Sequence, residues 1–252
     1  MIDILLSAFL VSIVLVGIHS YFGIEIIRRG IIFTDLAIGQ MAALGAAISL
    51  LLFDGTYIYP LSLLMAILAA LLVSYATIRS HHPEAIIGLL YAFSLSAVYI
   101  VLSKSYHGME EFYKLLASDI LFTSLPKIIE TALLYSVIGI MLYFIHHSAS
   151  KRFKDILFFA LFALTVTSSV KLAGVLIVFA LLLSPAMIAL SLVQKHHLAF
   201  AWIAGIAFNL ISILISYTFD LPTGYTLVAL HTLAAIVIGL VFGKNTHTAK
   251  QI

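Results

Sequence analysis

Residues 156–193 read ILFFALFALTVTSSVKLAGVLIVFALLLSPAMIALSLV, and Lys171 is the only charged side chain among them. A helix needs about 20 predominantly apolar residues to cross the hydrocarbon core of a bilayer. The stretch is therefore long for one crossing and tight for two. We predict two membrane spans here, hinged near Ser168-Ser169 and Gly174.

The rest of the chain repeats this apolar pattern from end to end. Of its 252 residues, 63% are hydrophobic and 10% are charged, whereas a water-soluble domain has about 25% charged residues. Cutting the chain at charges and turn residues gives further spans at 4–27, 31–53, 61–78, 85–103, 128–145, 198–219 and 223–242. The sequence predicts an all-α protein, a polytopic transmembrane helical bundle of eight or nine spans, with residues 1–252 forming a single transmembrane domain.

The basic residues predict the orientation of these spans, because Lys and Arg beside a span are retained on the cytoplasmic side. With the amino terminus outside, nine basic residues face the cytoplasm: Arg28, Arg29, Arg79, Lys151, Arg152, Lys154, Lys195, Lys244 and Lys250. Four face outward: Lys104, Lys114, Lys127 and Lys171. The first apolar run lacks a basic region before it and is expected to be a retained span. We expect a multi-pass protein of the cell inner membrane.

Composition and missing motifs exclude several function classes. The chain has no cysteine, which excludes disulfides, thiol catalysis and cysteine-based zinc sites. It also lacks the patterns His-Glu-x-x-His, Gly-x-Ser-x-Gly and Gly-x-x-x-x-Gly-Lys. A net charge of +2 is too small and too dispersed for nucleic-acid binding. We expect no enzyme activity, no nucleic-acid partner and no permanently bound cofactor.

Ionisable residues inside the spans are the first candidates for function, because charges in hydrocarbon are costly. They include Asp35, His19, Glu130 and His231. Each is either a polar group satisfied by a neighbouring helix or part of a functional site. A metal ion would need several of them to converge from different spans, because no two have ligand spacing along the chain.

Two further patterns concern ligands and packing. Residues 106–111, YHGMEE, offer an imidazole and two carboxylates on the predicted outer face, which suits either a divalent cation or a solvated polar loop. Gly39 with Ala43, and Ala42 with Ala46, place small residues four apart, which predicts close helix contact. Pro185 is expected to kink its span.

Several segments, in chain order, resemble motifs of one family. Residues 167–178, TSSVKLAGVLIV, and 183–186, LSPA, are similar to its run vGVLLv.ALLi.PA. Residues 216–224, SYTFDLPTG, are similar to its SY.lDLPtG before the final span, and residues 85–88 and 115–124 resemble further stretches. The family is that of the membrane permease subunits of metal-ion ABC importers, for zinc, manganese or iron. The resemblance runs from about residue 24 to residue 242.

This resemblance implies a type II ABC importer-like fold and translocation of a divalent metal ion, as transported substrate, by alternating access. It implies a homodimer, a cytoplasmic ATP-binding subunit and an extracytoplasmic metal-binding protein as separate chains, all assembled in or at the lipid bilayer. The family's second-span motif, GDAlsHa..pG, has an Asp and a His associated with the metal pathway. Asp35 matches the Asp, and the His position falls on or beside Gly39-Gln40. We take Asp35, Gln40 and, in the last span, His231 as the candidate metal residues.

Residues 146–154, HHSASKRFK, depart from the family pattern. At that point the family has an acidic coupling helix, roughly DPE.A...G, which docks into the ATPase. Nine residues allow little more than two helical turns, at about 3.6 residues per turn. A shortened contact, coupling through another loop, or loss of ATP-driven transport would each fit. An uncoupled metal-sensing or scaffold membrane protein with the permease fold is therefore the alternative, and a proton-coupled carrier using His231 and Glu130 is a third.

Overall fold

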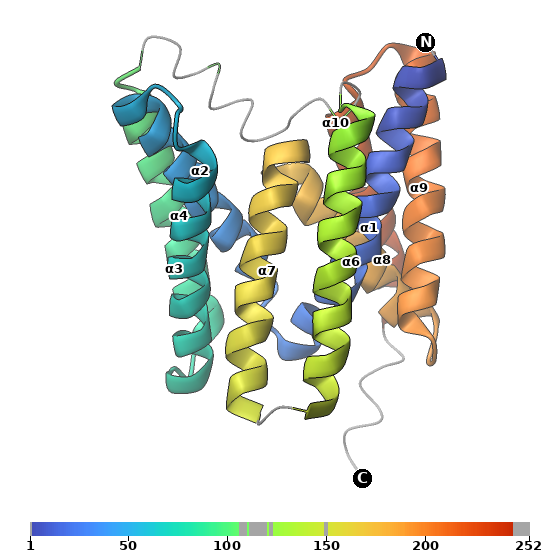
Figure 1. The fold of residues 1–252 in the computed structure, drawn as a ribbon. Helices are drawn as coiled ribbons and strands as arrows, with labels where there is room; N and C mark the ends of the chain where they lie inside the picture. Colours follow the sequence, from blue (N-terminus) through green and yellow to red (C-terminus); the bar gives the residue numbers. More distant parts are fainter. Residues whose placement is uncertain (1, 106–109, 111–119, 121–122, 149–150, 244–252) are drawn as a thin grey trace. The chain divides into compact units, whose positions relative to one another are not determined.

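The structure, a computed structural model, describes residues 2–105, 110, 120, 123–148 and 151–243. This part of the chain consists of helices joined by turns (Figure 1). The long helices are α1 (Ile2–Arg29), α2 (Thr34–Phe53), α3 (Ile58–Arg79), α4 (Pro83–Leu102), α6 (Leu125–Ser148), α7 (Lys151–Ala173), α8 (Val175–Leu192), α9 (His197–Phe219) and α10 (Thr223–Phe242).

Among the described residues, nine helices are long and apolar enough to cross a membrane. The predicted all-α, polytopic bundle is confirmed, at the upper value of the predicted span count.

The stretch 156–193 divides into α7 and α8 at Gly174. Gly174 has a backbone φ of +84°, in the left-handed region that glycine adopts without steric cost. The predicted hinge is confirmed at Gly174 but is wrong for Ser168 and Ser169, which lie inside α7. Their hydroxyl groups lie 3.0 and 2.6 Å from the Tyr135 hydroxyl of α6, so they join two helices instead of ending one. Helix α8 continues through Pro185.

The chain divides into two compact units, and each is described by itself. The first comprises Met1–Arg29, Asp119–Glu130 and Leu176–Ile252, and so contains α1, α9, α10 and most of α8. Within it, Gly23 of α1 leaves no room for a side chain against the backbone of Leu182 in α8. The Trp202 indole of α9 donates a hydrogen bond of 2.9 Å to the Gly17 carbonyl of α1. The single-domain organisation stays a prediction.

The second unit comprises Gly30–Ser118 and Thr131–Val175 and is built around α2. Helix α2 is buried from Thr34 to Ala47. The close contact predicted from its small residues is confirmed: a side chain at Gly39 would touch Val166 and Val170 of α7, and one at Gly45 would overlap the Leu61 backbone of α3. Removing side-chain bulk from α2 therefore lets helices approach it on two sides.

The turn between α9 and α10 explains the segment 216–224 physically. Helix α9 ends at Phe219 and is capped by Asp220, which has a left-handed φ of +51° and whose amide donates to the Ser216 carbonyl. The Ser216 hydroxyl lies 2.7 Å from both the Leu221 carbonyl oxygen and the Thr223 hydroxyl. Pro222 precedes the first turn of α10, where its missing amide proton costs no helix hydrogen bond. The motif is therefore a compact hairpin between two helices.

Candidate functional site

Asp35 is the second residue of α2 and is 2% exposed. The first four backbone amides of a helix lack partners within it, and the helix dipole favours a negative charge there. The chain entering the helix is fixed by the Thr34 hydroxyl, which donates a hydrogen bond of 2.7 Å to the Ile31 carbonyl. One carboxylate oxygen of Asp35, Oδ1, is buried and accepts no hydrogen bond. A buried carboxylate with an unused acceptor is suited to binding a cation.

Gln40 lies five residues further along α2 and is also 2% exposed. At about 100° per residue, five positions correspond to a rotation of about 140° around the helix axis. Gln40 therefore leaves α2 in a different direction from Asp35, whereas Gly39 lies on the Asp35 side. On the side of α2 that carries Asp35, the next turn has only Gly39, whose backbone packs against Val166 and Val170 of α7.

A small cavity of about 50 Å³ lies between α2, α3 and α7. Ala42, Ala43 and Ala46 line it from α2, and Tyr59 and Lys171 line it from the two other helices. The Lys171 ammonium lies 5.6 Å from the centre of the Tyr59 ring, within reach of a cation–π interaction. No carboxylate lines this cavity and it has a cation of its own, so its chemistry disfavours a metal ion.

His231 lies in α10, is fully buried and contacts α9. Its Nε2 lies 2.9 Å from the Oδ1 of Asn209. With that oxygen as acceptor, Nε2 carries the proton, and the other nitrogen, Nδ1, keeps a lone pair and has no hydrogen-bond partner. A neighbouring group that fixes one imidazole nitrogen in this way leaves the other available as a metal ligand.

The sequence did not single out Asn209, and it could have done so. It is the one amide side chain in the span 198–219, and polar amides inside spans often bond across helices. The contact itself depends on the packing of α9 against α10. The same holds for Tyr135, whose partners Ser168 and Ser169 lie on α7.

The remaining predicted groups are placed as follows. His19 is fully buried in α1, with Nδ1 2.7 Å from the Leu15 carbonyl oxygen of the same helix. Glu130 is exposed. The segment 106–111 lies outside the described residues except for Glu110. Across the described part of the chain, no three His, Asp or Glu side chains gather as a metal site. Asp35 and Gln40 belong to one unit and His231 to the other.

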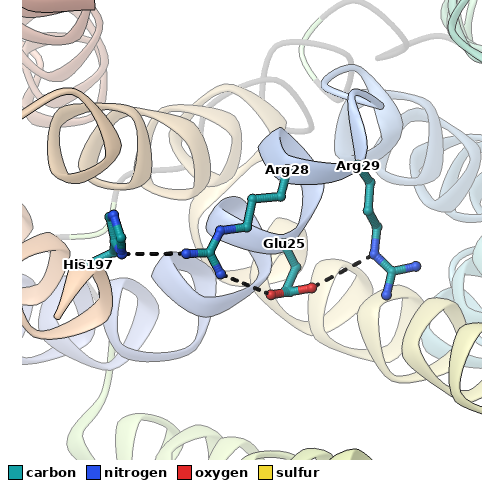
Figure 2. Close-up of polar contacts among 4 residues, drawn as sticks. All are labelled: Glu25, Arg28, Arg29 and His197. Atoms are coloured by element: carbon teal, nitrogen blue, oxygen red, sulfur yellow. Dashed lines mark hydrogen bonds and ion pairs between the residues drawn. The ribbon is translucent and has the colours of Figure 1, made fainter. Parts of the chain in front are cut away.

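A cluster of charged residues lies where α1 ends, on the predicted cytoplasmic side. Figure 2 shows the Glu25 carboxylate between two guanidinium groups, at 3.7 Å from Arg28 and 3.9 Å from Arg29. Arg28 also lies 3.4 Å from Nδ1 of His197, the first residue of α9. The cluster joins the end of α1 to the start of α9 and presents cations to solvent.

Comparison with known proteins gives a family match in the second half of the chain. The model of the ABC 3 transport family matches residues 148–242. This segment contains His231 and Asn209 but not Asp35 or Gln40. A Haemophilus influenzae protein named "Probable iron transport system membrane protein" is 37% identical over 87 residues, which are 33% of this chain and 31% of that protein. The match thus spans about a third of the length of this curated relative.

Two solved structures share the fold. PsaBC from Streptococcus pneumoniae, in complex with Fab, matches with a TM-score of 0.77 and 18% identity, over 97% of this chain and 94% of that chain. The resemblance found in the sequence is confirmed by the family match over residues 148–242, and the match to PsaBC shows the same fold over nearly the whole chain. An ABC transporter assigned to the metal-chelate type, in an inward-facing conformation, matches with a TM-score of 0.68 and 15% identity, over 95% and 85% of the two chains. The type II ABC importer permease fold therefore extends over nearly the whole chain.

Proposed function

We propose that this chain is the membrane-spanning subunit of an ABC importer that moves a divalent metal ion inward. It acts as a homodimer in the cell inner membrane, with the ATP-binding subunit and an extracytoplasmic metal-binding protein as separate chains. Zinc, manganese and ferrous iron all accept carboxylate and imidazole ligands. Transport proceeds by alternating access, in which the path opens first outward and then inward.

The observation that carries this proposal is Asp35, a buried acid with an unused carboxylate oxygen at the start of α2, a largely buried span. A charge inside a membrane protein is costly enough to need a role. Asp35 binds the ion in passage. Gln40, which leaves α2 in another direction, and His231, which belongs to the other unit, are separate contacts for the ion through the amide oxygen and Nδ1. In the described part of one chain, no three His, Asp or Glu side chains gather as a metal site. The ion is therefore shared between two copies or keeps bound water, as expected of cargo that must leave again.

The connection between α6 and α7 is where this chain differs from the family pattern that couples transport to ATP. Helix α6 ends at Ser148 and α7 begins at Lys151, so two residues separate them. An acidic docking helix of the family type has no place in that interval. This observation favours the second candidate function, an uncoupled metal-sensing or scaffold protein. If the importer is ATP-driven, the ATPase contacts other cytoplasmic groups, and the cluster of Glu25, Arg28, Arg29 and His197 offers exposed cations for an acidic surface.

Metal uptake in cells that lack their own importers tests the function. The chain would be expressed together with a candidate ABC ATPase from the same genome, and uptake of zinc, manganese and iron isotopes would be measured. The expected result is uptake of at least one metal that disappears when the ATPase is made unable to hydrolyse ATP. Metal binding without uptake would favour the sensor or scaffold, and uptake independent of the ATPase would contradict ABC coupling.

Co-purification with the ATPase at low and high salt tests the docking surface. We expect a weak complex that dissociates as salt rises, because exposed ionic contacts are screened beyond about 8 Å at physiological ionic strength. Arg28→Gln should weaken it further, and Lys127→Gln, on the predicted outer side, is the matched control. A stable complex indifferent to salt would show that another element couples the two chains.

A further inference from the structure

A groove of about 370 Å³ opens between the end of α3 and the start of α4. Its wall is mostly apolar, and its lining residues are Leu72, Tyr75, Ala76, Arg79, Ser80, Ile86 and Leu90. Arg79 and Ser80 lie at the turn between the helices, whereas Leu72 lies seven residues earlier, about 10 Å along the helix axis. The groove is therefore an apolar channel with a cation and a hydroxyl at one end.

The polar end of the groove has unused binding capacity for an anion. Arg79 is exposed and makes no ion pair with an acidic side chain among the described residues. Glu84, the nearest acid in the sequence, accepts a hydrogen bond of 3.4 Å from the Phe33 amide instead. The Ser80 hydroxyl accepts a bond of 3.0 Å from the His82 amide, which leaves its own proton to be donated.

The position of the groove relative to the membrane is set by Arg79, which is predicted to face the cytoplasm. Leu72, Tyr75 and Ile86 are all well exposed and lie on helices that cross the bilayer. The cytoplasmic leaflet is the one whose anionic lipids attract basic residues beside spans. An apolar wall that points into acyl chains and a guanidinium at headgroup level match the two parts of a lipid.

We propose that this groove binds an anionic phospholipid of the cytoplasmic leaflet, with its phosphate on Arg79 and Ser80 and an acyl chain along Leu72, Ile86 and Leu90. A free phosphate would satisfy Arg79 but leave the apolar wall uncovered. A second copy related by two-fold symmetry would cover Arg79 on both partners, because such an interface uses the same patch twice, and no acidic residue lines the groove to pair with these cations. The site is independent of whether the chain transports a metal.

Fluorescence quenching by brominated lipids tests the site in the reconstituted full chain. Trp202→Phe removes the single tryptophan of the sequence, and Tyr75→Trp then places a reporter in the groove. Brominated phosphatidylglycerol should quench this reporter about fivefold more effectively than brominated phosphatidylcholine, as expected for one basic group near the membrane surface. Arg79→Gln should abolish the preference, and Arg79→Lys should keep part of it.

The matched control is Arg29→Gln, which removes another cytoplasmic basic residue that does not line the groove; the preference should survive it. Equal quenching by the two lipids, or a preference unchanged in Arg79→Gln, would overturn the proposal. Loss of the preference on adding inorganic phosphate would show an anion site without lipid specificity, and would also overturn it. A reporter that neither lipid quenches would mean that protein covers the groove, which contradicts a lipid site.

Discussion

Helices α2 and α10 have the same length of 20 residues and similar hydropathy, yet their surroundings are opposite. In the apolar window of each helix, 67% of α2 is buried and 17% of α10. Helix α2 is rich in glycine and alanine along its buried length, whereas α10 has large apolar residues that are strongly exposed: Leu233, Ile236, Val237 and Leu240. Hydropathy therefore identifies a candidate membrane span but does not say how much of it other helices bury, and in α2 the small residues allow the close packing.

The two helices also differ in the hydrogen bonds of their buried ionisable residues, Asp35 in α2 and His231 in α10. Asp35 lies at the start of α2 and has a carboxylate oxygen without a hydrogen-bond partner, whereas His231 in α10 has one nitrogen fixed by Asn209 of α9. Each residue keeps one buried atom without a hydrogen-bond partner, Oδ1 of Asp35 and Nδ1 of His231. The bond to Asn209 gives His231 a role in packing α10 against α9 as well. We therefore expect Asp35 to contribute more to cargo binding than His231.

The largest effect is expected for Asp35→Asn. This change keeps the shape of the side chain but removes the charge that attracts a cation, so uptake should fall by about tenfold or more while the protein stays abundant in the membrane. Isotope uptake and immunoblotting of membranes would measure both. Asp54→Asn, at the other end of α2, is the control: Asp54 is exposed, has a left-handed φ of +48° that Asn also adopts, and should leave uptake unchanged. Normal uptake in Asp35→Asn would remove this residue from the ion path.

Asn209→Leu is expected to have the next largest effect if His231 is a ligand. Loss of the group that orients a metal-binding histidine typically costs 10- to 100-fold in metal affinity, so we expect a rise of about tenfold in the ion concentration that gives half-maximal uptake. Concentration-dependent uptake would be compared with thermal unfolding of the purified protein. Unchanged uptake with a lower melting temperature would mean that the pair only holds α9 against α10.

Gly45→Ala tests the tight surroundings of α2. Its new methyl group would overlap the backbone of Leu61 and Ser62 in α3, and overpacking of this kind costs about 1–3 kcal/mol. We expect a lower unfolding temperature in detergent. Gly139→Ala in α6 is the matched control, because a side chain there meets open space and should stabilise the helix slightly.

Leu240→Ala should have the smallest effect. Leu240 is 75% exposed on α10, so lipid or detergent replaces the lost contacts, and the free energy of unfolding should change by less than about 0.5 kcal/mol. The same thermal measurement applies. A loss as large as that of Gly45→Ala would show that another protein surface covers α10 in the assembled state.

The sequence by itself narrowed the number of spans to eight or nine and determined their approximate limits and the membrane setting, because these depend on local composition and on charges at helix ends. It also predicted the break at Gly174 and the close packing of α2, since glycine and small residues act through the backbone at their own position. Asp35 could be found from the sequence as an acid inside a span, and the motif similarity supported it.

Tertiary structure alone decided which groups have partners. The bond from His231 to Asn209, the placing of Ser168 and Ser169 beside Tyr135, and the groove ending at Arg79 each join helices whose packing no local pattern encodes. The sequence places Gln40 about 140° around α2 from Asp35. Only the structure shows that both directions face other helices, so that the two side chains have different neighbours. The positions of the spans follow from the free energy of transferring apolar side chains from water to lipid. The contacts between helices depend on how their side chains fit, because lipid provides no hydrophobic driving force that would bring helices together.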